Sequence, residues 1–315
     1  MKLRLNLLIL IVLTSQFIHS QKSEMPKEQK DFMYSMKFEM LKDIFKKPKY
    51  NFKSRNLDID KIFIKSNKTK ESIILSIEYF EKNAKLEITN ERSKKIKLQS
   101  NFPDSFIPEK LNVISIKIEE NKLLGNENIP LETLNTSSTL FGINVTQSTQ
   151  LSFDSKFDKN LTGEVSYRIK FITDYSSKKI SKEEIGKTIN LSESQYKIID
   201  IFENKIVLKS NLKETLTIDD LKVKCISLDK KGKMELFSEN WSLTSSLIDE
   251  EIYQFFKENK EVDIETCRNK FTFEKLMDDK LLGKYIILEV PAPIENEVIL
   301  YEPIYGVNEI INVKL

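Results

Sequence analysis

The chain has 315 residues, 40% of them hydrophobic, with 50 Lys and Arg against 48 Asp and Glu and a formal net charge of +2. This small net charge lacks the excess of Lys and Arg that is typical of a nucleic-acid-binding protein, so no nucleic-acid partner is expected. Seven glycines argue against glycine-rich phosphate loops, and the ample apolar content excludes a disordered or collagen-like chain.

Residues 1–20 have the pattern of a secretory signal peptide. Lys2 and Arg4 form a positive start, and the apolar segment 5–13 that follows is shorter than the ~20 residues of a membrane span. Cleavage is expected after the small residue Ser20, which predicts a secreted or periplasmic protein without stable membrane insertion. An uncleaved anchor is the alternative.

Cleavage at this point would remove the only histidine, His19, together with two of the 50 basic residues, leaving 48 basic and 48 acidic side chains. Histidine is the usual general base near neutral pH and the commonest metal ligand. Without it, Ser-His-Asp and Cys-His catalysis and His-ligated zinc or haem are excluded from the mature chain. We expect no cofactor, metal site or catalytic residue, and predict that the protein is not an enzyme.

Residues 21–50 are predicted to form a polar leader and an amphipathic helix. Segment 21–30 is charged, and from 31 to 47 apolar residues recur at three- and four-residue steps until Pro48 stops the pattern. The helix is rich in methionine, which is typical either of a core face or of an adaptable binding face.

Residues 51–150 are predicted to form an N-terminal β domain, because the apolar period changes to two after Ile62. Each expected strand has one buried and one polar face. The expected strands lie at 73–79, 84–88, 96–98 and 114–118. Segment 121–138 is expected to be irregular and to close this domain.

Residues 151–245 alternate most clearly and are predicted to form an antiparallel β-sandwich. Apolar and polar side chains alternate over 164–171, and Glu203-Asn204 is a candidate hairpin turn. Strands at about ten-residue spacing favour an immunoglobulin-like architecture, although the Cys-Trp-Cys spacing of such domains is missing. The further expected strands lie at 188–191, 196–202, 205–209, 221–228 and 234–237.

Residues 246–315 are predicted to form a small α+β unit. A helix is expected to start at Ser246–Asp249 and to end near Asn259, and a shorter helix is expected at 273–281. Strands are expected at 285–290 and 298–301. The predicted fold class is therefore mainly β, with one or two antiparallel β-sandwich domains, an N-terminal helix and this C-terminal α+β unit.

Three residues stand out as candidates for a special role. Cys225 and Cys267 are the only cysteines, and in an exported protein they form either a disulfide or two separate buried thiols. Trp241 is the sole tryptophan, and its side chain is either packed or exposed as an anchor for a partner.

The predicted function is an exported, non-catalytic binding or structural module. Its partner is expected to be a protein or a glycan, met through loops or an exposed edge strand. Two alternatives remain. A carboxylate-dependent hydrolase of glycans or a similar exported substrate requires two acids in a cleft, and a carrier of an apolar ligand requires an internal cavity.

Overall fold

A computed structural model describes the greater part of the chain. The described residues are 25–47, 52–54, 63, 65–89, 95–106, 114–125, 130–141, 143–151, 162–192, 194–211, 221–227, 235–237, 245–278, 284–290, 293–295 and 297–315. The expected signal peptide and Trp241 lie outside them. More of the described residues lie in strands than in helices, which confirms the mainly β class, and the sheets are antiparallel and none of them closes. Within the described part of the chain, no helix combines the length and hydropathy of a membrane span.

The chain folds into two compact units. Unit 1 contains the described residues within 65–174 and 304–315, and unit 2 contains those within 25–63 and 175–303. Strands β7 (Glu164–Ile180) and β15 (Val298–Lys314) each contribute residues to both units. Residues 304–315, which the sequence assigned to a C-terminal unit, therefore belong with unit 1. The domain boundaries after residues 150 and 245, which were expected from the sequence, stay a prediction.

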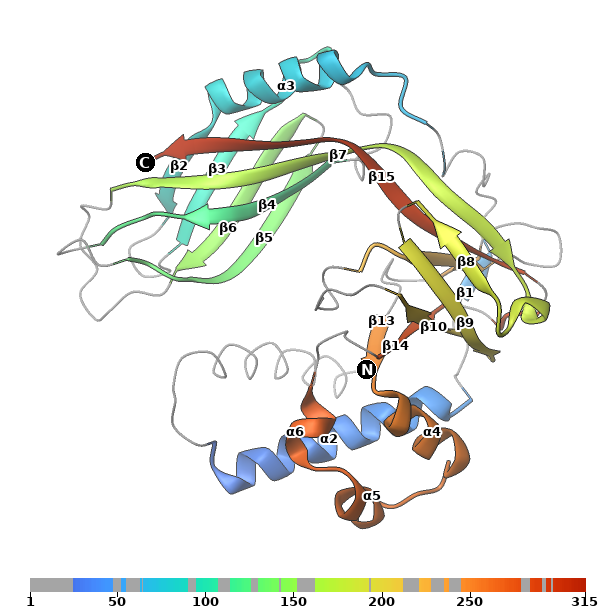
Figure 1. The fold of residues 1–315 in the computed structure, drawn as a ribbon. Coiled ribbons are helices and arrows are strands. Elements are labelled where there is room, and N and C mark those ends of the chain that lie inside the picture. The colour runs from blue at the N-terminus through green and yellow to red at the C-terminus, as the bar shows by residue number, and fades with distance from the viewer. Residues whose placement is uncertain are drawn as a thin grey trace. The chain divides into compact units, whose positions relative to one another are not determined.

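Unit 1 is built from two sheets and a helix. The first sheet has the strand order β2 (Lys85–Thr89), β3 (Lys95–Asn101), β6 (Asn144–Leu151) and β5 (Thr133–Phe141). The second contains β4 (Ile114–Asn121) and the unit 1 parts of β7 and β15. Helix α3 (Lys70–Asn83) runs alongside β2 and β3 (Figure 1). One apolar core joins α3, β3, β6, β7 and β15.

Two expectations for unit 1 were wrong. Segment 73–79 is helix rather than strand, because Ile73 and Ile77 form its buried face, while Leu75 and Tyr79 lie on the exposed face. Because apolar residues occur on both faces of this helix, they alternate with polar residues in the sequence as they would in a β-strand. Segment 121–138, expected to be irregular, contains the first part of β5, whose polar residues give no apolar alternation. The strands predicted near 84–88, 96–98 and 114–118 are confirmed as β2, β3 and β4.

Unit 2 contains a sheet with the order β13, β14, β10, β9, β8. These strands span Ser245–Ile248, Tyr285–Glu289, Lys205–Ser210, Ser194–Phe202 and Thr188–Leu191. Both faces of the central strands are buried. One face packs with β11 (Lys224–Ser227) and the start of β15, and the other packs on helices α2 (Lys27–Phe45) and α4 (Glu250–Glu258). Unit 2 also contains α5 (Ile264–Lys270), α6 (Phe273–Met277), the 3-10 helix η4 (Lys182–Glu184), and the paired strands β1 (Phe52–Ser54) and β12 (Glu235–Phe237).

The predictions for unit 2 have mixed outcomes. The N-terminal helix is confirmed, but it starts at Lys27, within the segment 21–30 that was expected to be a polar leader. Strands β8, β9, β10 and β14 and the turn at Glu203-Asn204 are also confirmed. Of the strands expected at 221–228 and 234–237, the first contains β11, which pairs with β15, and the second contains β12, which pairs with β1.

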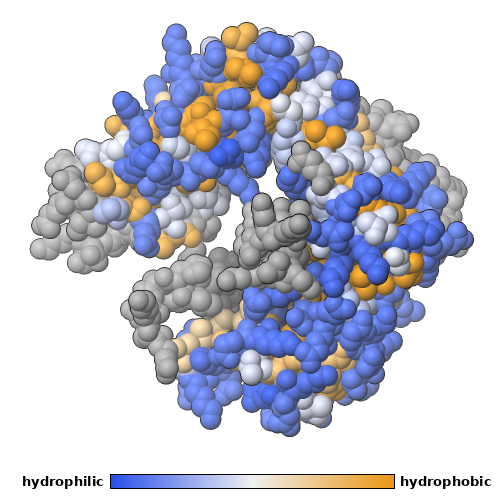
Figure 2. Space-filling model, in the orientation of Figure 1, coloured by the Kyte–Doolittle hydropathy of each residue, from blue (hydrophilic) through white to orange (hydrophobic). Residues whose placement is uncertain are grey.

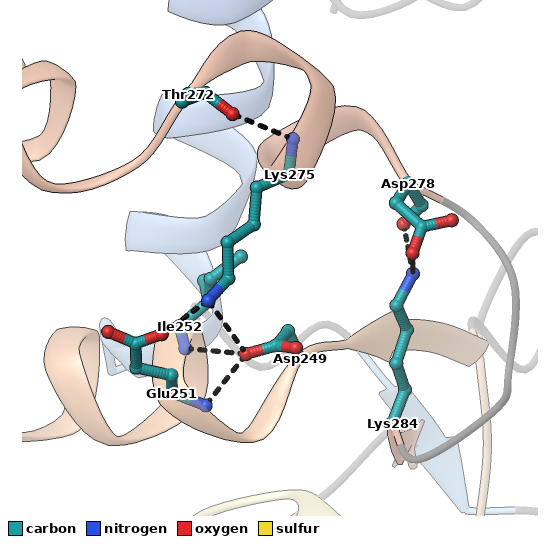
Figure 3. Close-up of polar contacts among 7 residues, drawn as sticks. All are labelled: Asp249, Glu251, Ile252, Thr272, Lys275, Asp278 and Lys284. Carbon is teal, nitrogen blue, oxygen red and sulfur yellow. Dashed lines mark hydrogen bonds and ion pairs between the residues drawn. The ribbon is translucent and has the colours of Figure 1, made fainter.

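The start of α4 was also predicted wrongly. Ser246 lies in β13, and Asp249 caps the helix by accepting hydrogen bonds from Glu251 N at 2.8 Å and Ile252 N at 3.4 Å (Figure 3). Lys275 of α6 contacts Glu251 and lies 3.9 Å from Asp249. The helix expected at 273–281 is α6, which ends at Met277.

Candidate functional site: the uncharged edge strand of unit 1

Strand β5 and its neighbour β6 form a hairpin without a charged residue. Residues 133–153 contain no Asp, Glu, Lys or Arg, in a chain in which these residues make up 31%. This is the longest such segment in the sequence, and most of its strand residues are Ser, Thr, Asn or Gln. We call residues 133–151 the uncharged hairpin. The missing charges are the signal from which sequence analysis could have found it.

Strand β5 is the edge of its sheet. It pairs with β6 on one side and ends the strand order on the other. Side chains on both of its faces are exposed, namely Thr133, Leu134, Thr136, Ser137, Ser138 and Thr139. Proteins commonly protect long edge strands with Lys, Pro or an inward-pointing charge. The nine residues of β5 include none of these, although the pairing with β6 is irregular between Thr133 and Asn135. Among the described residues, no strand pairs with the outer edge of the regular part, Asn135–Phe141.

Contacts at both ends hold β5 in an extended conformation. Before the strand, Leu131 N donates to Leu123 O at 3.1 Å, and Asn121 Nδ2 donates to Leu131 O at 2.7 Å. After it, Phe141 pairs with Asn144 across a two-residue loop. The strand is thus already ordered, which lowers the entropy that a partner strand must offset on binding.

The alternation of hydrogen bonds identifies which β5 residues face the open edge. The closing pair of a two-residue hairpin exchanges both of its backbone hydrogen bonds, and such pairs alternate with non-bonded pairs. With Phe141 and Asn144 as the closing pair, Thr136 and Ser138 direct their N–H and C=O groups away from β6. A backbone bond from Phe102 N to Ile143 O agrees, because it places odd-numbered residues of β6 on the β3 side.

The inner face of β6 carries two buried polar side chains without partners. Gln147 is 0% exposed and Thr149 is 3% exposed. Among the described residues, neither the Gln147 amide nor Thr149 Oγ1 has a hydrogen-bond partner. They lie between apolar Leu98 and Ile96 of β3 and exposed Ser138 and Thr136 of β5. Polarity therefore increases step by step from the core to the open edge.

The two cysteines lie in unit 2, in different apolar clusters. Both are buried free thiols: Cys225 packs in the cluster on the β11 face of the sheet, and Cys267 packs in the helical cluster. Burial raises the pKa of both thiols. Tyr34 Oη donates to Cys267 Sγ at 3.4 Å and to Phe271 O at 3.0 Å. This arrangement corresponds to the alternative of two separate thiols.

Buried ionisable groups of unit 2 lie next to hydrogen-bonding partners. Glu302 accepts a hydrogen bond of 2.5 Å from Tyr196, and Lys205 donates to Asn204 Oδ1 at 2.9 Å. Burial lowers the pKa of Lys205. A buried ionisable group requires such hydrogen-bonding partners, and the bond from Tyr196 to Glu302 also joins β9 to β15.

Two further features of unit 2 bear on ligand binding. A surface hollow of about 570 Å³ is lined by residues 257–262 and Thr266. Among the described residues, no group of three or more His, Cys, Asp or Glu is arranged to hold a metal ion.

Comparison of the chain with protein-family models, curated proteins and solved structures finds no match.

Proposed function

We propose that the protein is a non-catalytic binding module whose partner protein adds an extended strand to β5. In strand addition, main-chain hydrogen bonds supply affinity and alternate side chains supply specificity. One observation carries the proposal: β5 is a nine-residue edge strand, exposed on both faces and without charge or proline. On the face shown in Figure 2, hydrophobic residues form scattered patches in a mostly hydrophilic surface, which favours recognition through the backbone.

The proposal includes the finer features predicted from the sequence. The apolar cores support a sandwich-like packing, since each joins residues of two sheets. An immunoglobulin-like strand order stays a hypothesis within this packing. The apolar segment at 5–13 supports export to the periplasm or the medium. Trp241 stays a predicted partner contact.

The other functions have less support. A glycan hydrolase needs two acids in a cleft, and a carrier needs an apolar cavity. The hollow at residues 257–262 is a surface feature with mostly charged or polar lining. A glycan partner would bind through side chains and would not need the outward amides of β5.

Strand addition can be tested with a defined probe, an end-blocked heptapeptide of alternating Thr and Val. It is expected to slow hydrogen exchange at the outward amides of β5. Ser138→Pro should abolish this protection because proline has no N–H to donate, whereas Ser138→Thr should retain it. Unchanged exchange at β5 with saturating peptide would refute the proposal.

A further inference from the structure

We infer that the strand added to β5 is β5 of a second copy, in antiparallel orientation about a two-fold axis. This inference rests on the proposed function and names its partner. The pairing would join two four-stranded sheets into one continuous sheet. A two-fold interface uses the same surface on both partners, so β5 must be complementary to itself.

The absence of charge makes β5 self-complementary. In antiparallel self-pairing each residue of β5 faces a residue of β5 in the other copy. Like charges placed opposite each other are destabilising. Among β5 residues this conflict does not arise, and pairs of Thr and Ser across strands are favourable.

Other sheet edges are poorer candidates for self-pairing. Edge β2 carries Lys85 and Glu87, and edge β4 carries Lys117, Glu119 and Glu120. Edges β8 and β13 are free of charge, but each has four residues against the nine of β5. With 48 basic and 48 acidic residues after cleavage at Ser20, two mature chains would also lack net repulsion.

The geometry requires one residue of β5 to face its own copy across the two-fold axis. Outward-facing residues of one strand pair with outward-facing residues of the other, so even-numbered residues of β5 face even-numbered ones. The residue numbers of two facing residues therefore add up to an even number, which is the same for every facing pair. The residue whose number is half of this sum faces its own copy. The candidates nearest the centre of β5 are Thr136, Ser137 and Ser138.

The first measurement is sedimentation velocity of the mature chain, residues 21–315. The fraction of dimer is expected to rise with protein concentration, because a single pair of strands forms only a small interface. Ser138→Pro is expected to abolish dimerisation, whereas Ser138→Thr retains both the amide and the dimer. A dimer that persists in Ser138→Pro, with the fold intact by circular dichroism, would place the interface elsewhere and overturn the inference.

The second measurement is a single-cysteine scan with Thr136→Cys, Ser137→Cys and Ser138→Cys. One of the three variants should form an intermolecular disulfide much faster than the others, because only a residue on the axis brings its own copy within disulfide distance. The native thiols are buried and do not compete while the protein is folded. Equal, slow oxidation of all three would contradict the two-fold pairing.

The inference and the proposed function can fail separately. A wild-type chain that stays monomeric while the Thr-Val peptide still protects β5 would remove the second copy as partner and leave strand addition standing. A monomer whose β5 amides the peptide does not protect would refute both.

Discussion

Ser138 on β5 lies directly opposite Gln147 on β6, yet Ser138 is exposed whereas Gln147 has no accessible surface. Neighbouring strands are about 4.8 Å apart, so the boundary between solvent and core falls within one strand spacing. The sheet therefore reaches past the core that covers it, and β5 projects beyond this core.

The buried amide of Gln147 is expected to cost stability. It has no hydrogen-bond partner in the part of the chain that the structure describes, and an unsatisfied buried polar group costs about 1–3 kcal/mol. We predict that Gln147→Leu, which keeps a similar volume, raises the free energy of unfolding by about this amount in urea denaturation. Gln150→Leu, on the half-exposed outer face, is the control and should show no comparable gain. A loss of stability in Gln147→Leu would show that the amide is hydrogen-bonded in solution.

Asp249, rather than Ser246, is expected to determine where α4 begins. Its carboxylate accepts two backbone N–H groups of the first turn. Removal of such a cap typically costs about 1 kcal/mol. Thermal and urea unfolding should therefore show Asp249→Ala destabilised by about 1 kcal/mol. Ser246→Ala, in β13, should be less affected, and equal losses in the two variants would argue against this assignment.

Stability is expected to fall at alkaline pH, with Tyr196 as one contributor. Burial raises the pKa of its phenol, and the hydrogen bond to Glu302 raises it further. The folded state then holds this proton more tightly than the unfolded state, whose tyrosines titrate near pH ~10. The stabilisation is complete below that pH and is lost above it, at up to about 1.4 kcal/mol per pH unit for each such group.

The variant Tyr196→Phe isolates this contribution. It is expected to unfold more easily at neutral pH because the hydrogen bond is gone, but to lose stability less steeply as pH rises above about 10. The measurement is the free energy of unfolding by urea at a series of pH values up to about 11.5. Parallel pH profiles for the variant and the wild type would show that Tyr196 does not contribute.

The two thiols are expected to be unreactive in the folded protein. Both are buried, and a raised pKa lowers the fraction of reactive thiolate. Ellman's reagent should detect no thiol under native conditions and two in denaturant without reductant. Detection of no thiol in denaturant would instead establish a disulfide between Cys225 and Cys267. The melting temperature should not change with dithiothreitol.

Local patterns predicted much of unit 2 but less of unit 1. The hairpin of β9 and β10 was predictable because its turn and both alternating strands are contiguous in sequence. Helix α3 was not, because Leu75 and Tyr79 add apolar residues to its exposed face. An edge strand was anticipated as a binding surface, but β5 itself was not identified, since its Ser, Thr and Asn residues show no apolar period.

The sequence by itself determined the mainly β class, the boundaries of several strands, and the absence of histidine beyond His19. These follow from composition and from periodicity over a few neighbouring residues. Tertiary structure alone decided that β12 pairs with β1, that residues 304–315 join unit 1, and that β5 is an exposed edge. Such features depend on which distant segments compete for each backbone edge and apolar face, and that competition is settled only when the whole chain packs.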